Sequence, residues 1–295
     1  MHEQDWLAAR FEEQRPRLRS VAYRLLGSLA EADDAVQETW LRASRAGADD
    51  VANLGGWLTT IVARVSLNLL QSRRTRREDS LGMHLPEPII GHADGGNPEH
   101  AALLADAVGL ALLVVLEALE PAERVAFVLH DVFAVPFDTI APIVERSPTA
   151  TRQLASRARR RVRLATTAPD TDLARQRAVV DAFLAAARGG DFAALLAVLD
   201  PDVVLRTDRT VAASGRVQEV RGAQAVAEGA RTFARLALSA QPALVNGVAG
   251  VVAWGADGQP FSVLAFTVVR GKIVAIDSLS DPARLHRLDL ASLTP

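Results

Sequence analysis

Cysteine is absent from the 295 residues of this chain. Its absence excludes disulfides, thiolate nucleophiles and metal sites built from cysteine, and it favours a reducing compartment. The chain also lacks an uninterrupted apolar run of membrane-spanning length, and its acidic N-terminus, MHEQDWLAARFEEQ, lacks the apolar core of a signal peptide. These absences predict a cytoplasmic protein that makes no contact with a membrane.

A large net charge is missing too, since the formal value is −2. Taken alone, that value argues against a polyanionic partner, but the basic residues are concentrated in two places. Residues 71–77 carry four arginines and residues 149–163 carry six, and neither segment contains an acid. Two basic segments far apart in the chain indicate two contact points on one polyanion. The hydrophobic content of 49% and the length are those of a folded protein with two or three domains.

A pair of short helices with a tight turn between them is predicted for residues 137–163. The first has an apolar side at helical spacing, made of Phe137, Ile140, Ala141 and Val144. Ser147 can act as the N-cap of the second helix, and Pro148 suits its first position. The second helix has an apolar stripe at every fourth residue, made of Ala150, Leu154, Ala158 and Val162. This pattern is typical of a helix-turn-helix that lays its second helix in a DNA groove.

Two interpretations of this helix pair remain open. It is either an amphipathic hairpin with a solvated polar face, whose basic end suits the helix dipole, or a nucleic-acid-binding element. The missing acid between Thr149 and Arg163 favours the second interpretation, because solvated faces mix charges of both signs.

Three helices are expected at residues 5–29, 31–46 and 57–74, with a loop from Gly47 to Gly56. Apolar residues at helical spacing predict their inner faces: Trp6, Phe11, Leu18, Val21, Ala22, Leu25 and Leu29; Ala35, Val36, Trp40 and Leu41; and Trp57, Leu58, Ile61, Val62, Val65, Leu69 and Leu70. The outer face of the second helix, with its cluster of acids at residues 33–38, is either solvated surface or a dock for a basic partner. Trp57 is either a core residue or a platform on which an unpaired base stacks.

These segments resemble the two conserved halves of an extracytoplasmic-function sigma factor. The resemblance is carried by ADDAVQETWLRA, by LGGWLTTIVARVSLNLLQSRRTRRED, and by LEPAERVAFVLHDVFAVPFDTIAPIVERSPTATRQLASRARRRVR. It covers roughly residues 10–78 and 98–164.

The resemblance implies three contacts. RNA polymerase core would be bound through Asp33, Asp34, Gln37 and Glu38. The −10 promoter element would be recognised and melted by Asn53, Trp57, Arg64, Asn68, Arg73 and Arg74. The −35 element would be read by Thr149, Arg152, Gln153, Ser156, Arg157 and Arg160. Among the last set, Arg152, Gln153 and Arg157 are expected to set specificity, because their side chains can donate to base edges.

Two residues depart from the family's pattern. The family usually has glycine at the turn position that Glu145 occupies, and Pro142 lies within what should be the first helix of the pair. A proline inside a helix destabilises it by about 3 kcal/mol, but a proline in the first turn does not. We therefore expect this helix to begin at or near Asp138, with Asp138 as its N-cap.

Residues 79–98 contain three prolines, four glycines and no helical period, which predicts a flexible linker. Within it, Leu85, Pro86, Glu87 and Pro88 resemble the LPEP signature of the subgroup that carries a SnoaL-like C-terminal domain, and they are expected to be regulatory. His84, His92 and His100 stand eight residues apart, but without cysteine or clustered acids no metal site is expected.

The C-terminal third is predicted to be an α+β domain. Helices are expected at residues 172–188, 189–199 and 222–238, a strand at 203–208, and extended runs at 243–255, 261–270 and 272–281. Arg270 and Gly271 suit a hairpin turn between the last two runs. The stretch DAFLAAARGGDFAALLAVLDPDVVL resembles the SnoaL-like domain, a cone-shaped fold whose pocket is used both by polyketide cyclases and by non-catalytic modules.

An enzymatic role would need a polar constellation in that pocket. Asp208, Trp254, Asp277 and His286 are candidates for an acid–base pair, although no spacing singles them out. The subgroup's DGGGK stretch is replaced here by TDRTVAASGR, and the sequence at 281–285 matches the subgroup's closing motif only in part. We therefore expect no catalytic residue, no cofactor and no metal.

The chain is thus predicted to be a multidomain protein. Its parts are a helical sigma region 2 domain at 1–78, the linker at 79–98, a helical sigma region 4 domain with the helix-turn-helix at 99–166, and a SnoaL-like α+β cone domain at 167–295. Its expected partners are RNA polymerase core and promoter DNA, with intramolecular contact of the C-terminal domain regulating the sigma domains in cis. Two alternatives stay open: a SnoaL-type cyclase or isomerase with a DNA-binding appendage, and a one-component transcription factor that uses the helix-turn-helix alone.

Overall fold

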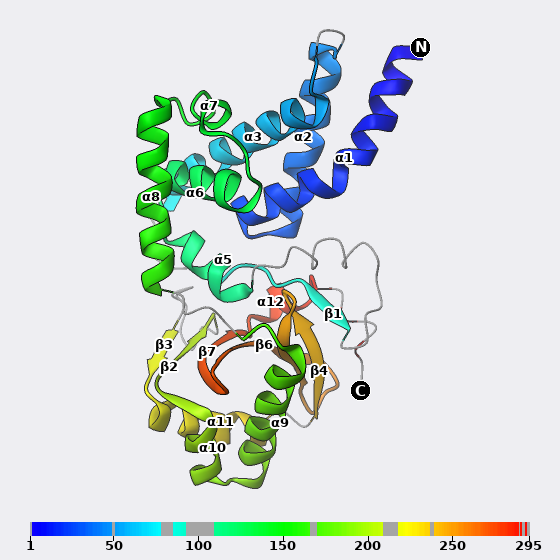
Figure 1. Cartoon of the computed structure of the whole chain (residues 1–295). Helices are drawn as coiled ribbons and strands as arrows, with labels where there is room; N and C mark the ends of the chain where they lie inside the picture. The colour runs from blue at the N-terminus through cyan, green and yellow to red at the C-terminus, as the bar shows by residue number, and fades with distance from the viewer. Residues whose placement is uncertain are drawn as a thin grey trace. The chain divides into compact units, whose positions relative to one another are not determined.

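The computed structural model describes residues 2–48, 51–77, 85–92, 109–165, 170–208, 218–236, 239–288, 290 and 293. The chain divides into two compact units (Figure 1). We call residues 1–81 and 115–165 the helical unit, and residues 82–114 and 166–295 the sheet unit. Among the described helices, none combines the length and the apolar character that crossing a membrane requires.

Three long helices build the first part of the helical unit: α1 (His2–Leu26), α2 (Leu29–Ala46) and α3 (Leu54–Arg77). α1 ends where Gly27 adopts a φ of 71°, a left-handed conformation that favours glycine. Ser28 then caps α2, because its side chain accepts a hydrogen bond from the Glu31 amide at 3.5 Å. These two residues separate α1 from α2.

The predicted inner faces of these helices are wrong at two positions. Leu41 is 40% exposed and Trp6 is 49% exposed, although both were expected to face inward. The buried side chains of α2 are Ala32, Ala35, Val36, Thr39 and Ala43. Leu41 follows Thr39 by two residues, which places it on the opposite side of the helix.

Shorter helices build the second part of the helical unit: the end of α5 (Leu110–Glu117), α6 (Pro121–Phe127), the π-helical turn η1 (Val128–Val132), α7 (Phe137–Ile140) and α8 (Pro148–Ala165). Arg124 of α6 is 2% exposed. Its Nη2 and Nε donate to the carbonyl of Arg24, near the end of α1, at 3.3 and 3.4 Å. Its Nη1 pairs with Glu117 at 3.0 Å. A buried guanidinium therefore joins two segments that are 100 residues apart in the chain.

A seven-stranded sheet organises the sheet unit. Its strands are β1 (Ile90–His92), β2 (Leu199–Thr207), β3 (Gln218–Arg221), β4 (Ser239–Val245), β5 (Val248–Trp254), β6 (Pro260–Val269) and β7 (Lys272–Leu279). Their order across the sheet is β1-β4-β5-β6-β7-β2-β3. Neighbouring strands are antiparallel except β2 and β7, which are parallel.

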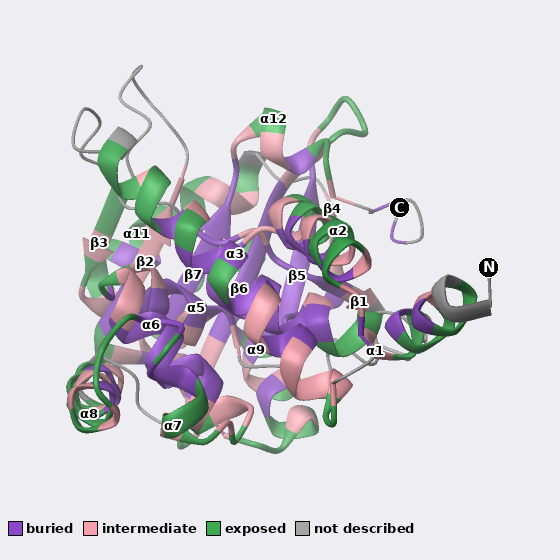
Figure 2. Cartoon of the chain, turned by 90° about the horizontal axis from the view of Figure 1, so that it is seen from above, coloured by how far each residue is buried: buried purple, intermediate pink, exposed green. Residues whose placement is uncertain are grey.

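Three helices pack on one face of this sheet: α9 (Leu173–Gly189), α10 (Phe192–Val198) and α11 (Ala223–Leu236), while the short α12 (Pro282–Leu285) follows β7 (Figure 1). The three correspond to predicted helices, with ends that differ by up to three residues. Between them and the sheet lies a core in which the rings of Phe183 and Phe266 meet edge to face at 5.5 Å. Figure 2 shows the buried residues along the central strands β5, β6 and β7.

Tight turns define the strand ends in two places. The run predicted at residues 243–255 is two strands rather than one, because Asn246 and Gly247 adopt φ angles of 50° and 76° and reverse the chain between β4 and β5. The predicted turn at Arg270 and Gly271 is present, with φ angles of 51° and 74° between β6 and β7. Strand β3 was not predicted.

Residues 85–92 do not form the flexible linker expected for residues 79–98. β1 pairs with β4, with Ile90 opposite Val245, and both Leu85 and Ile89 are 2% exposed. Proline and glycine concealed this strand, since they suppress the alternating pattern that predicts one. Of the three histidines discussed above, His92 lies in β1, whereas His84 and His100 lie outside the described residues.

Candidate nucleic-acid interface

The turn before α8 accounts for the two residues that depart from the family's pattern. α7 begins at Phe137, one residue before the predicted N-cap Asp138, and ends at Ile140. Pro142 therefore lies beyond the regular helix and interrupts none. Glu145 adopts a φ of 53°, the left-handed conformation that costs an L-residue roughly 1–2 kcal/mol. A glycine at this position would avoid that cost.

α8 begins at the predicted residue, but the side chains that it buries differ from the predicted apolar stripe. The Ser147 hydroxyl accepts a hydrogen bond from the Ala150 amide at 3.2 Å, and Pro148 is the first helical residue. The side chains buried along α8 are Thr151, Ala155 and Ala158, so Ala150 and Leu154 were misassigned. Short side chains at these buried positions allow α8 to pack closely on α6.

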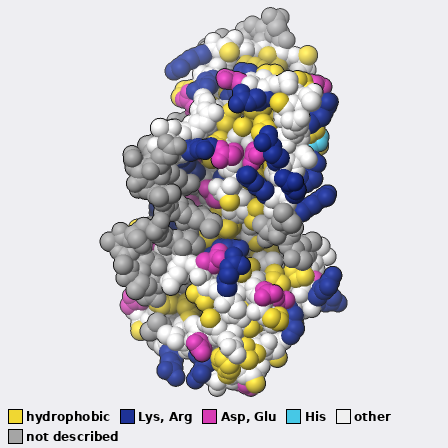
Figure 3. Space-filling view, turned by 90° about the vertical axis from the view of Figure 1, so that its left-hand side faces the viewer, with side chains coloured by type: hydrophobic (Ala, Val, Ile, Leu, Met, Phe, Trp, Pro, Cys, Tyr) yellow, Lys and Arg dark blue, Asp and Glu magenta, His cyan; other side chains and the backbone are white. Residues whose placement is uncertain are grey.

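The predicted −35 residues all lie on the exposed side of α8: Thr149, Arg152, Gln153, Ser156, Arg157 and Arg160. Figure 3 faces this side and shows Arg side chains gathered in the helical unit. The surface offers several donors to a groove and, within α8, no acid.

Three arginines of α8 are engaged by acids from other elements. Arg159 donates to both carboxylate oxygens of Asp131 at 2.8 and 3.0 Å. Arg161 donates to Glu123 at 2.8 Å, and Arg157 lies 3.8 Å from the same carboxylate. The sequence pattern missed these pairs because the acids lie far upstream in the chain. Arg157 thus shares a carboxylate within the protein.

The predicted −10 residues divide into exposed and engaged side chains. Arg64 and Asn68 are exposed on α3, and Trp57 is partly exposed. Asn53 caps α3, because its side chain accepts a hydrogen bond from the Gly56 amide at 2.9 Å.

Two further arginines of this set have acidic partners within the helical unit. Arg73 donates to Glu31 and to the Leu26 carbonyl, each at 2.9 Å, and so joins α3 to the α1–α2 connection. Arg74 forms an ion pair with Glu120, the residue before α6. Both side chains therefore have partners that the sequence did not reveal.

The exposed side of α3 and the turn before α8 line one hollow of about 330 Å³. Arg64 and Asn68 contribute from α3, and Pro142 and Glu145 contribute from the turn. The Arg64 guanidinium donates to the Pro142 carbonyl at 3.5 Å. Two of the predicted −10 residues thus lie beside the turn that precedes α8.

The acidic face of α2 lies outward, which fits both a solvated surface and a docking surface. Asp33 accepts two hydrogen bonds from Arg19, at 2.6 and 3.0 Å, and Glu38 pairs with Arg42 at 2.8 Å. Asp34 and Gln37 are exposed. These exposed groups remain accessible to a basic partner.

The LPEP segment is fastened to the sheet unit by a set of contacts that we call the linker clasp. The Arg284 guanidinium donates to the Leu85 carbonyl at 2.6 Å and to the Asp208 carboxylate at 2.8 Å. Asp208 in turn accepts a hydrogen bond from the Ser280 amide at 2.6 Å. A second attachment holds Ile89, whose amide donates to the Asn246 side chain at 2.9 Å.

The candidates for an acid–base pair do not converge. Asp208 belongs to the linker clasp, and His286 is exposed beyond α12. Asp277 is buried and accepts a hydrogen bond from Arg206 at 3.1 Å; burial raises the pKa of Asp277, and the guanidinium partly offsets this. Trp254 is buried, and its indole N–H has no hydrogen-bond partner in the described part of the chain.

The sheet unit also has a partly open cavity of about 200 Å³ between the sheet and helices α9 and α11. The described lining residues are mostly apolar and include no acid and no histidine. None of the four candidates for an acid–base pair is among them.

Two family models match the chain: "Sigma-70 region 2" at residues 10–76 and "Sigma-70, region 4" at residues 109–162. Together with the helix-turn-helix, they define a sigma-70-type factor. The chain is 39% identical to the "ECF RNA polymerase sigma factor SigJ" of Mycobacterium tuberculosis, over 92% of this chain and 91% of that protein. It is 36% identical to the "Probable ECF RNA polymerase sigma factor SigI" of the same species, over 98% of each.

The crystal structure of M. tuberculosis SigJ matches with a TM-score of 0.77 and 38% identity, covering 94% of this chain and 97% of that one. The chain therefore belongs to the extracytoplasmic-function sigma factors of RNA polymerase, in the subgroup with a SnoaL-like C-terminal domain. Its fold class is the predicted one, sigma helices followed by an α+β domain. The comparisons support a sigma factor and not the alternative of an enzyme with a DNA-binding appendage.

Proposed function

We propose that the exposed side of α8 reads the −35 element, that α3 with Asn53 holds the melted −10 element, and that the outer face of α2 binds RNA polymerase core. The observation that carries this proposal is the acid-free set of exposed donors on α8. Groove recognition needs side chains that can donate to base edges, and the neighbouring arginines add affinity through phosphates.

The −35 assignment is tested by in vitro transcription with purified core polymerase and mapped start sites. Arg152→Ala and Gln153→Ala should each lower output and relax base preference at one −35 position, since a good base contact contributes about 1–3 kcal/mol. Arg175→Ala, an exposed arginine of α9, is the control for loss of one positive charge. Unchanged base preference in both variants would remove α8 from the role.

The core-binding assignment is tested with Asp34, which is exposed on α2. Asp34→Lys reverses one charge without breaking an ion pair, so it should weaken binding to core polymerase in a pull-down titration. Asp181→Lys on α9 makes the same charge change elsewhere and should leave binding intact. Equal binding by the two variants would contradict the assignment.

We also propose that the sheet unit regulates the sigma function in cis through the linker clasp. The clasp fixes the segment between the two sigma regions, and a sigma factor must set the spacing of those regions to span two promoter elements. Arg284→Gln removes the donor to Leu85 and should change promoter output, whereas Arg287→Gln, an exposed neighbour, should not. Removal of residues 168–295 is the wider test: unchanged core binding and unchanged output would reject regulation in cis.

A catalytic role for the sheet unit is not part of this proposal. Acid–base chemistry requires a proton donor or acceptor at the substrate, and the described cavity lining offers neither an acid nor a histidine.

A one-component transcription factor is disfavoured because it would leave α2 and α3 without a role. Co-purification with RNA polymerase core separates that alternative from a sigma factor. Since a sigma factor acts on RNA polymerase, we place the chain in the cytoplasm.

A further inference from the structure

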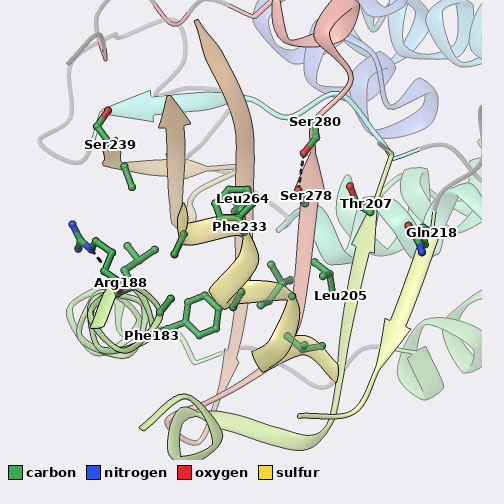
Figure 4. Close-up of a pocket in the computed structure, with 18 residues that line it drawn as sticks. Phe183, Arg188, Leu205, Thr207, Gln218, Phe233, Ser239, Leu264, Ser278 and Ser280 are labelled. Atoms are coloured by element: carbon green, nitrogen blue, oxygen red, sulfur yellow. Dashed lines mark hydrogen bonds between the residues drawn. The ribbon is translucent and has the colours of Figure 1, made fainter. Parts of the chain in front are cut away.

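The cavity of the sheet unit has two chemically different ends (Figure 4). Phe183, Phe233 and Leu264 line its apolar part, and Thr207, Ser278 and Ser280 line the other end. The charged residue of the described lining is Arg188, which is exposed and points away from the rings in Figure 4. A charged molecule would therefore lose its hydration without gaining a buried partner.

The size of the cavity limits the ligand. A dry protein cavity of roughly 150 Å³ holds one benzene molecule. A cavity of about 200 Å³ has room for one ring and a few further atoms. A one-ring molecule therefore fits within this volume.

The hydroxyl end defines the polar group of that molecule. The hydroxyls of Ser262, Ser278 and Ser280 lie 2.8–3.0 Å from one another, and the Ser262 hydroxyl also donates to the Leu279 carbonyl at 3.1 Å. Each hydroxyl has one proton and two acceptor positions, so these bonds use the protons and leave acceptor positions open. A ligand that donates a hydrogen bond therefore fits the open acceptor positions of this end.

The same end adjoins the linker clasp. Ser280 contributes its hydroxyl to the cavity and its amide to Asp208, the partner of Arg284. Arg284 holds the Leu85 carbonyl. A chain of three residues, Ser280, Asp208 and Arg284, thus connects the cavity to Leu85 in the segment that precedes β1.

We propose that this cavity binds an uncharged one-ring molecule bearing a hydroxyl group, and that its occupancy strengthens the linker clasp. The coupling rests on the proposed regulation in cis, whereas the binding site does not. Thermodynamic linkage is reciprocal: a ligand that strengthens the clasp must also bind more tightly when the clasp is closed.

Binding is tested by calorimetry on the full chain with three probes. 4-Ethylphenol should bind saturably, and its isomer 4-methylanisole, which lacks the donor, should bind about 2- to 10-fold more weakly, the range expected for one net hydrogen bond. The anion 4-methylbenzoate should not bind. Ser278→Ala should reduce the preference for 4-ethylphenol over 4-methylanisole.

Two matched variants locate the site. Ala230→Leu adds a side chain into the cavity lining and should abolish binding, whereas Ala225→Leu, on the exposed side of the same helix, should not. Absence of saturable 4-ethylphenol binding, equal affinity for the two isomers, or equal loss in both variants would overturn the proposed site.

The coupling is tested by hydrogen exchange of peptides that cover residues 85–92. Saturating 4-ethylphenol should slow their exchange at least twofold in the parent chain and not in Arg284→Gln. Binding without slower exchange would overturn the coupling. The proposed regulation in cis fails separately, when Arg284→Gln leaves promoter output unchanged in the absence of any probe.

Discussion

Replacement of Glu145 by glycine should stabilise the helix-turn-helix. Glu145 has a φ of 53°, which costs an L-residue roughly 1–2 kcal/mol, and glycine avoids that cost but adds about 0.5–1 kcal/mol of unfolded-state entropy. The expected net gain is about 0.5–1 kcal/mol. Hydrogen exchange of peptides covering residues 137–165 should therefore slow about 2- to 5-fold, because protection reports the local opening free energy.

The control for this prediction separates backbone strain from charge. Glu145→Ala removes the carboxylate but keeps the Cβ, so it should leave the exchange rates unchanged. Both variants should bind −35 promoter DNA more tightly than the parent chain, since both remove an acid from the turn that precedes α8. If alanine slows exchange as much as glycine does, the stabilisation comes from charge and the argument from φ is refuted.

Three further predictions concern stability. Ser147→Ala removes the N-cap of α8 and should cost about 1 kcal/mol, measured as faster exchange in α8; unchanged exchange would mean that the cap is dispensable. Arg124→Met removes the buried guanidinium that pairs with Glu117 and should cost roughly 3–5 kcal/mol in urea unfolding. Addition of Glu117→Gln should recover part of the loss, and an additive double variant would contradict coupling of the pair. Backbone amides of the β6–β7 turn, first that of Arg270, donate to Asp170 and lower the pKa of its carboxyl from 3.8. The stabilisation by Asp170 is therefore present above pH 3.8 and is lost as the pH falls through the lowered pKa of the folded state. Asp170→Asn should flatten this acid dependence in thermal unfolding scans, and an unchanged profile would assign the dependence to other groups.

Features that depend on a few neighbouring residues could be predicted from the sequence. Ser147 and Pro148 mark the start of α8 because a cap and a fixed φ act within one helical turn. Arg270 and Gly271 mark a hairpin for the same reason. The exposed −35 face also follows from local pattern, although the buried positions in the first half of α8 are Thr151 and Ala155 rather than Ala150 and Leu154.

Features that depend on distant partners could not be predicted. Arg73 lies in a basic segment that is typical of DNA contacts. Its hydrogen bond to Glu31 depends on how α3 packs against the start of α2. Nothing in the sequence around Leu85 predicts that its carbonyl accepts a hydrogen bond from Arg284, which lies 199 residues away. Such contacts arise from the tertiary fold, and sequence periodicity carries no information about them.

If β1 separated from the sheet, it would uncover a sheet edge. β1 covers one edge of the sheet by pairing with Ala243, Leu244 and Val245 of β4. Without β1, these residues would present unpaired backbone groups, which are a template for pairing with another chain. Pro242 limits that template on one side, because it has no N–H to donate. A chain without β1 in place would therefore expose a short unpaired strand edge. We expect such a chain to self-associate at high concentration unless another strand takes the place of β1.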